Sequence, residues 1–69
     1  SNQPLGWVAW LGEGLAASEL GDRVAADRDF VAAARIDSRQ SAVKQALARV
    51  FSSNPLTPSE AVSLLAVHE

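Results

Sequence analysis

Apolar side chains recur at helical spacing near the start of the chain. Over a segment from about Pro4 to Leu20, the residues Trp7, Leu11 and Leu15 lie four positions apart, so a helix here would carry one apolar stripe. The proline at its start suits a first helical turn, where its missing N–H is not needed. Gly21 then predicts the end of this helix, because glycine readily adopts the left-handed conformation that ends many helices.

A second helical pattern runs from about Asp22, a favoured N-cap residue, to Ile36. One face of this helix would be apolar, through Leu20, Val24 and Val31. Asp27 falls in the middle of that stripe, where a buried carboxylate would be costly. We therefore expect a break near Asp27, with Asp27 or Asp29 capping a shorter helix that begins at Phe30.

A short strand near residues 30–36 is the alternative for the second half of this segment. Three consecutive alanines at positions 32–34 disfavour it, because alanine is depleted in strands. The sequence alone leaves helix and strand both open for residues 27–36.

Two further helices have clearer boundaries. Ser38 to Phe51 carries a narrow apolar stripe, and Asp37 with Gln40 resembles a capping box at its start. The loop Ser52–Pro55 follows. The last helix opens with Thr57-Pro58-Ser59-Glu60, which combines an N-cap threonine, a first-turn proline and a glutamate at the third position.

These patterns predict an all-α fold, a compact bundle of three to four short helices. The 69 residues, 48% hydrophobic and 20% charged, have a globular composition. They fit one domain, residues 1–69, near the lower size limit for folding without disulfides or metals. We expect the chain to be a fragment of a longer protein, since it contains no methionine and its last helix ends without a stop signal.

The charge is distributed unevenly along the chain. The segment from Glu13 to Asp29 contains five acidic residues and two arginines, which gives a net charge of −3. Between Arg35 and Arg49, four bases face one aspartate, a net charge of +3. We interpret this as an acidic second helix packed beside a basic third helix, within one protomer or across a dimer. The bases are scattered around their helix and form no basic stripe, so nucleic-acid binding is not favoured.

The residue types that carry chemistry are few. There is no cysteine, and the one histidine, His68, is next to the C-terminus, so neither a zinc site nor a serine–histidine relay can be assembled. Asp27 and Asp29 are two apart and would point to different sides of a helix. Gly12-Glu13-Gly14 lacks the lysine and the strand of a phosphate-binding loop, and its expected effect is to loosen the first helix. We expect no enzyme, no cofactor and no metal.

The first helix carries two of the four aromatic residues, Trp7 and Trp10. Because they are three apart, one can anchor the core while the other stays near the surface. Aromatic side chains concentrate binding energy at interfaces. Trp7, Trp10 and Leu11 are therefore the predicted partner-binding residues.

Residues 35–66 resemble the ribbon–helix–helix domain of bacterial antitoxins. The resemblance lies in Arg35-Ile36-Asp37 and in the run Thr57-Pro58-Ser59-Glu60-Ala61. It implies an obligate dimer whose paired strands enter a DNA major groove. Arg35 would then read bases, while Arg39 and Thr57 would complete the nucleic-acid site. About thirty residues precede the implied strand, where the family normally begins.

The sequence as a whole favours a non-catalytic domain that acts in protein–protein interaction, docking, assembly or regulation of a bacterial protein. We expect it to self-associate, most simply as a homodimer through its first helix. A dimeric DNA-binding antitoxin or transcriptional regulator is the alternative. No segment reads as a signal peptide or spans a bilayer, so we expect no membrane partner and a cytoplasmic location.

Overall fold

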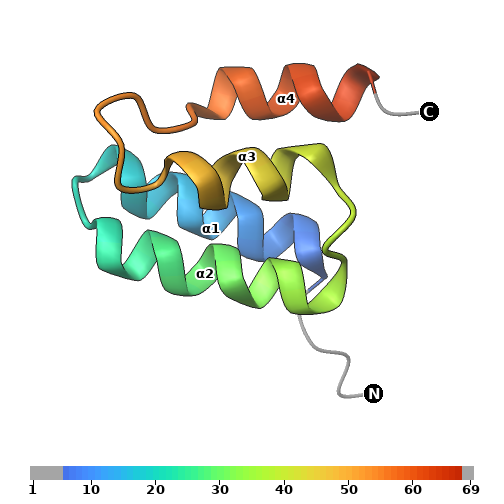
Figure 1. Ribbon diagram of the computed structural model, residues 1–69, viewed down its shortest axis with the longest axis horizontal. Coiled ribbons are helices and arrows are strands. Elements are labelled where there is room, and N and C mark those ends of the chain that lie inside the picture. The colour runs from blue at the N-terminus through green and yellow to red at the C-terminus, as the bar shows by residue number, and fades with distance from the viewer. Residues whose placement is uncertain (1–5, 68–69) are drawn as a thin grey trace.

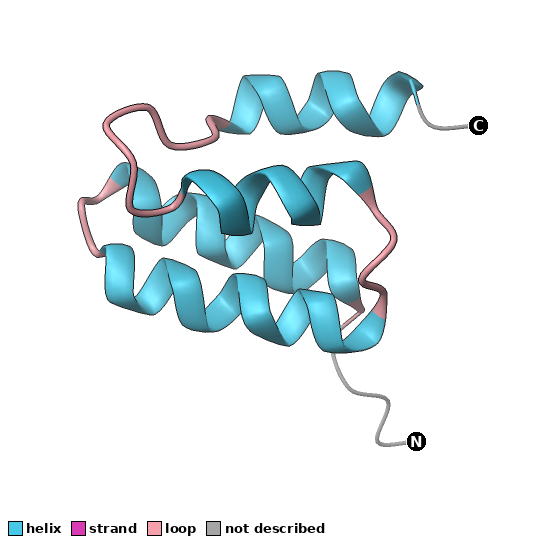
Figure 2. Cartoon of the chain, in the orientation of Figure 1, coloured by secondary structure: helices cyan, strands magenta, loops and turns pink. Residues whose placement is uncertain are grey.

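A computed structural model describes residues 6–67 of the chain, and these form a bundle of short helices (Figure 1). The four helices are α1 (Trp7–Glu19), α2 (Arg23–Ile36), α3 (Ser41–Arg49) and α4 (Pro58–Val67). Within residues 6–67 there is no strand (Figure 2). The all-α prediction is confirmed, and the predicted start of α1 at Pro4 and end of α4 at His68 lie outside the described residues.

The turn between α1 and α2 forms as the sequence predicts. Gly21 has φ 87°, the left-handed conformation that glycine adopts without steric cost. The N–H of Gly21 donates to the carbonyl of Ser18, and the N–H of Asp22 donates to the carbonyl of Ala17, so the last carbonyls of α1 are satisfied by a Schellman motif. Asp22 then caps α2 by accepting a hydrogen bond from the N–H of Ala25 at 3.1 Å.

The predicted break near Asp27 is wrong, because α2 is one continuous helix from Arg23 to Ile36. Asp27 is only half-buried, so its carboxylate keeps contact with water and does not incur the full cost of burial. The buried face of α2 is a different one, formed by Ala26, Phe30 and Ala33. The alternative strand near residues 30–36 is likewise wrong, since these residues are helical.

A buried glycine sets how closely α1 and α2 pack. Gly14 is buried at the contact with α2. A Cβ added there would lie 2.5 Å from Cε1 of Phe30 and 3.1 Å from Cβ of Asp29. Gly14 therefore does not merely loosen α1, as the sequence suggests; the missing side chain leaves the space that the Phe30 ring occupies.

The third helix is shorter than predicted at both ends. It begins at Ser41 and ends at Arg49 rather than running from Ser38 to Phe51. Asp37 does not cap it, because Asp37 ends α2, accepting hydrogen bonds there from the backbone N–H of Arg39 and the side-chain amide of Gln40. The aspartate–glutamine pair thus folds the connection between the helices instead of forming a capping box.

All four helices contribute to one core. Phe30 is 1% exposed and lies at its centre, and the other buried apolar residues are Leu11, Leu15, Ala26, Ala33, Ala42, Val43, Ala46, Val50, Leu56 and Ala61. Contact is most extensive between α1 and α2, and α4 touches α3 and α1 much more sparingly. The helix pair α1–α2 is therefore the main packing unit, and α4 is an outer layer above α3 (Figure 1).

Candidate interaction surface

The three residues predicted to bind a partner through α1 occupy different environments. Leu11 is 2% exposed and belongs to the core, so it is not accessible to a partner in this fold. Trp7 is half-buried and packs against the core cluster. Trp10 is also half-buried, three positions along the helix. The aromatic residues of α1 therefore serve the core in part, and Val8 is the large apolar side chain that this helix exposes.

Six large apolar side chains are exposed in the described part of the chain, namely Val8, Leu20, Val24, Ile36, Phe51 and Val62. Two of these, Val24 and Phe51, are 63% and 61% exposed and come from segments far apart in sequence. A hydrogen bond of 2.7 Å from Nη1 of Arg23 to the carbonyl of Ser52 joins their immediate neighbours. The start of α2 and the segment after α3 are thereby held together at one end of the bundle (Figure 1).

Helical geometry extends this apolar contact along α2. Val24 and Val31 are seven residues apart and so project from the same side of the helix. Asp29, on the flank of α2 next to Gly14 of α1, lies on another side. Val31 is therefore on a flank directed away from Gly14 of α1, and it is half-buried.

The neighbouring flank of α3 is apolar as well. Gln45 and Arg49 line the groove toward α4, so Leu47 projects from the opposite flank of α3. Phe51 lies two residues beyond the end of α3, next to Ser52, whose carbonyl accepts the hydrogen bond from Arg23 at the start of α2. Leu47 is half-buried and Phe51 is exposed. We name the surface formed by Val24, Val31, Leu47 and Phe51 the α2–α3 face.

Two charged side chains flank the centre of the α2–α3 face. Asp27 and Arg35 stand four residues before and four residues after Val31, within an arc of about 80° around the helix. The two ion pairs among the described residues join Arg39 to Asp37 and Arg49 to Glu60. Within this part of the chain, neither Asp27 nor Arg35 takes part in an ion pair.

The acidic and basic segments of the chain form no ion pair with each other among the described residues. Among residues 6–67, no ion pair joins the acids of α1 and α2 to the bases of α3. The acids Glu19 and Asp22 lie by the α1–α2 turn, while Arg35 and Arg39 lie by the α2–α3 connection at the opposite end (Figure 1). Arg23 and Arg49 also lie at the first end and Asp37 at the second, so each end carries charges of both signs.

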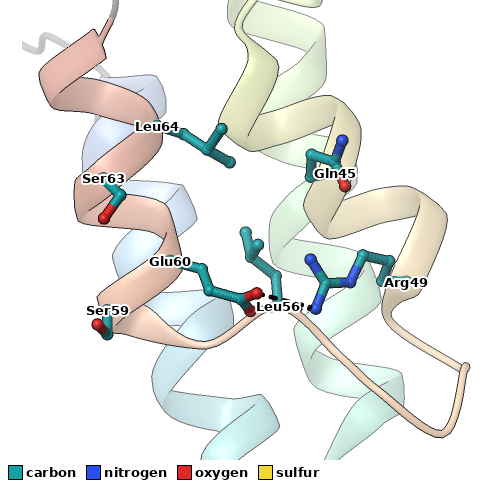
Figure 3. A pocket seen from close by; sticks show the side chains of 7 residues that line it. All are labelled: Gln45, Arg49, Leu56, Ser59, Glu60, Ser63 and Leu64. Carbon is teal, nitrogen blue, oxygen red and sulfur yellow. Dashed lines mark hydrogen bonds and ion pairs between the residues drawn. The ribbon is translucent and has the colours of Figure 1, made fainter.

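A groove between α3 and α4 is the second surface feature. Its volume is about 390 Å³, and its lining is formed by Gln45, Arg49, Leu56, Ser59, Glu60, Ser63 and Leu64 (Figure 3). Its floor is apolar at Leu56, but its mouth is spanned by the ion pair between Arg49 and Glu60, 3.0 Å apart. Arg49 and Glu60 are engaged with one another, while the polar side chains of Gln45, Ser59 and Ser63 also line the groove.

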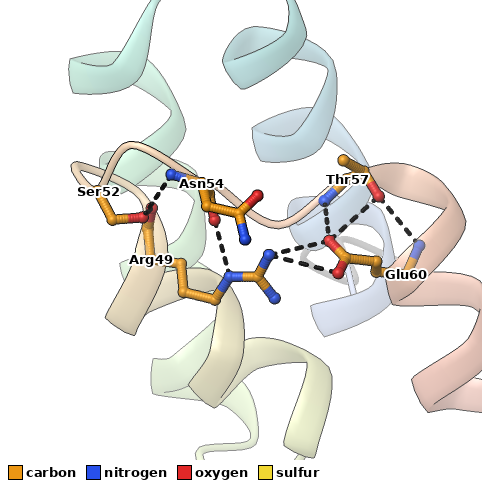
Figure 4. Close-up of polar contacts among 5 residues, drawn as sticks. All are labelled: Arg49, Ser52, Asn54, Thr57 and Glu60. Atoms are coloured by element: carbon orange, nitrogen blue, oxygen red, sulfur yellow. Dashed lines mark hydrogen bonds and ion pairs between the residues drawn. The ribbon is translucent and has the colours of Figure 1, made fainter.

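Arg49 organises the corner where α3 leads into α4 (Figure 4). Its Nε donates to the carbonyl of Asn54 at 2.8 Å, and its Nη2 donates to Glu60. Ser52 adds a bond from its hydroxyl to the carbonyl of Arg49. The residues between α3 and α4 are therefore held in place by polar contacts. The sequence alone identifies Arg49 only as one of four basic residues and does not predict this role.

Thr57 is occupied at the start of α4. Its hydroxyl accepts a hydrogen bond from the N–H of Glu60 at 3.2 Å, and its own N–H donates to Oε1 of Glu60 at 3.1 Å. This is the reciprocal capping box that the sequence predicts. The hydrogen bond from the Thr57 N–H, followed by the Arg49 guanidinium, lowers the pKa of Glu60, although partial desolvation opposes this.

The residues that the antitoxin resemblance implies for DNA do not stand on a ribbon. Arg35 is an exposed side chain in the last turn of α2, and Arg39 is in the connection after it. Asp37 between them has a lowered pKa because Gln40 and Arg39 donate hydrogen bonds to its carboxylate. The strand that would present Arg35 to a major groove is helical here, and DNA binding stays a prediction of the resemblance alone.

Within the described residues, no group of three or more histidine, cysteine, aspartate or glutamate side chains is placed to hold a metal ion. The predicted terminal His68 lies outside these residues. None of the helices described has both the length and the apolar character needed to cross a membrane.

Comparison of the chain with protein-family models, with curated proteins and with solved structures found no match. The α2–α3 face combines exposed apolar side chains with two charged side chains, Asp27 and Arg35, that form no ion pair among residues 6–67.

Proposed function

We propose that this domain is a non-catalytic interaction module that self-associates through the α2–α3 face. The observation that carries the proposal is the exposure of Val24 and Phe51, 63% and 61%, on two segments that the hydrogen bond between Arg23 and Ser52 holds together. Single exposed apolar residues are ordinary on a protein surface, but a contiguous apolar patch is typical of an interaction site.

The small size of the domain gives the patch a thermodynamic role. The core holds one buried aromatic side chain and several alanines, and a domain of this length has little stability in reserve. Burial of Val24, Val31, Leu47 and Phe51 against a partner would add to the apolar area removed from water. Association would therefore stabilise the fold as well as join two proteins.

The charged ends support association in a defined orientation. The acids near the α1–α2 turn and the bases near the α2–α3 connection have no ion-pair partner from the opposite group within residues 6–67. Opposite charges on a surface steer encounter and set orientation more than they add affinity.

Sedimentation equilibrium of the purified chain tests the proposal, over low micromolar to near-millimolar concentration. We expect a dimer whose dissociation constant rises at least about tenfold in Val24→Ser, because each chain loses an apolar contact at the interface. Val62→Ser is the matched control, since Val62 is 64% exposed but lies on α4, away from this face.

Circular dichroism checks that both variants keep the helical fold. A wild-type chain that stays monomeric over the whole range contradicts the proposal. An equal loss of association in Val24→Ser and Val62→Ser would contradict the choice of face.

A further inference from the structure

We infer that the occupant of the α2–α3 face is a second copy of this chain, with the two α2 helices packed antiparallel about a two-fold axis near Val31. The inference rests on the proposed function and adds the identity, direction and register of the partner. It is carried by the order of side chains along one flank of α2.

That order is self-complementary. Asp27 lies four residues before Val31 and Arg35 four residues after it, on the same flank of the helix. In a two-fold contact each residue meets the symmetry-related surface of the other copy. With Val31 on the axis and the helices antiparallel, Asp27 of each copy faces Arg35 of the other, so one pattern produces two ion pairs.

A parallel arrangement of the same helices is disfavoured by the same residues. It would place Asp27 beside Asp27 and Arg35 beside Arg35, which juxtaposes like charges twice. At positions 27 and 35 the flank therefore favours the antiparallel direction, while the exposed Arg28, three residues before Val31, adds a further base to the same side of α2.

The ends of the protomer carry charges of both signs. Glu19 and Asp22 are exposed near the α1–α2 turn, where Arg23 begins α2, and Arg35 and Arg39 are exposed near the α2–α3 connection, where Asp37 ends α2. The Asp27–Arg35 pairs, and not the ends of the protomer, therefore set the direction. The uneven charge that the sequence displays is then used between protomers, since no ion pair uses it within the described part of one.

The position of Asp27 in an apolar stripe also acquires a reason. In the monomer its carboxylate interrupts the flank that carries Val24 and Val31, without an ion-pair partner among residues 6–67. Across the dimer it meets a guanidinium at the edge of an apolar centre, where a bidentate pair is geometrically favourable. The apolar side chains provide affinity, and the Asp27–Arg35 pairs set the register.

Charge reversal followed by complementation tests the inference. Asp27→Arg and Arg35→Glu each convert both attractive pairs into repulsive ones. We expect each variant alone to dimerise with a dissociation constant at least about tenfold above wild type. Mixing the two restores both pairs, because one chain then presents two bases and the other two acids, so the mixture should form a heterodimer with near wild-type affinity.

Sedimentation equilibrium and native mass spectrometry of the single variants and of their equimolar mixture provide the measurement. Glu13→Arg is the control for Asp27→Arg, because Glu13 is an exposed acid on α1, and its reversal raises the net charge by the same amount away from the face. Circular dichroism confirms that each variant is folded.

The outcomes separate the inference from the proposal beneath it. Restored association in the mixture, with Glu13→Arg unaffected, supports the antiparallel dimer. The wild-type chain can dimerise, and Val24→Ser can weaken the dimer, while Asp27→Arg and Arg35→Glu have no effect. In that case the inferred register is wrong, and the proposed self-association through the α2–α3 face is still supported. Equal weakening by Glu13→Arg also overturns the register, since net charge then explains the loss. If the wild-type chain is monomeric, both the antiparallel dimer and the proposed self-association are contradicted.

Discussion

The two helix pairs of this bundle are held together in different ways. Between α1 and α2, a tight turn at Gly21 and a buried glycine at Gly14 bring the helices into close apolar contact with Phe30. Between α3 and α4, the chain runs through residues 50–57, and Arg49 ties that connection to Glu60 through hydrogen bonds. The first pair depends on shape, which is unforgiving to added volume, and the second on polar contacts that water can replace.

The sharpest test of this difference is Gly14→Ala. The new methyl group would lie 2.5 Å from Cε1 and 2.7 Å from Cδ1 of Phe30, so this buried ring would have to shift. Overpacking of this kind costs about 1–3 kcal/mol, and the better helix propensity of alanine returns up to about 1 kcal/mol. We expect a net fall in the free energy of unfolding, measured by urea denaturation.

Gly12→Ala is the matched control, because a Cβ at Gly12 meets nothing within 4 Å. The same substitution two residues earlier should therefore raise stability by about 0.5–1 kcal/mol. Phe30→Leu combined with Gly14→Ala should cost less than the sum of the two single changes, since the smaller side chain relieves the contact. Equal effects at the two glycines would show that close packing is not what distinguishes the α1–α2 pair.

A smaller effect is expected at the α3–α4 corner. Arg49→Ala removes the hydrogen bonds to the Asn54 carbonyl and to Glu60, and water can replace them because the corner is partly exposed. We expect amide hydrogen exchange in α4 to speed up about three- to tenfold, with the amides of α2 unchanged.

Arg49→Lys serves as its control, because it keeps the positive charge but loses the planar fork that reaches two acceptors. If lysine restores the slow exchange of α4, charge alone holds the corner. If α2 exchanges faster to the same degree as α4, the two helix pairs are not independent in stability.

The smallest effect follows from pH. The pKa of Glu60 is lowered from its ordinary value of 4.5 by the hydrogen bond from the Thr57 N–H and by Arg49. A carboxylate whose folded pKa is depressed contributes stability above its unfolded pKa and loses it as pH falls through the folded pKa. The melting temperature should therefore fall as the pH is lowered below about 4.5, and this fall should be smaller in Glu60→Gln.

Asp37 has a lowered pKa as well, so part of the acid dependence will remain in Glu60→Gln. Loss of the remaining part in the double variant with Asp37→Asn would assign it. An unchanged acid profile in Glu60→Gln would mean that the capping carboxylate does not couple α4 to the rest of the fold.

Local sequence determined where several helices begin and end. The Gly21-Asp22 pair and the Thr57–Glu60 run satisfy backbone groups within a few residues of themselves, so they act in any context. The same reasoning misplaced Asp37, because an aspartate followed by a glutamine can cap a helix or fold a connection, and neighbours decide which.

Only the tertiary structure decided what is buried and what is exposed. Asp27 does not break α2, because Phe30 and the rest of the buried face lie on another side of the helix. Gly14 reads as a weak helix former in the sequence, and its role appears only where Phe30 fills its space. Leu11 is in the core, while Val24 and Phe51 are exposed to water. Helical periodicity shows which residues share a face but not which face is covered, because that depends on contacts between segments far apart in the chain.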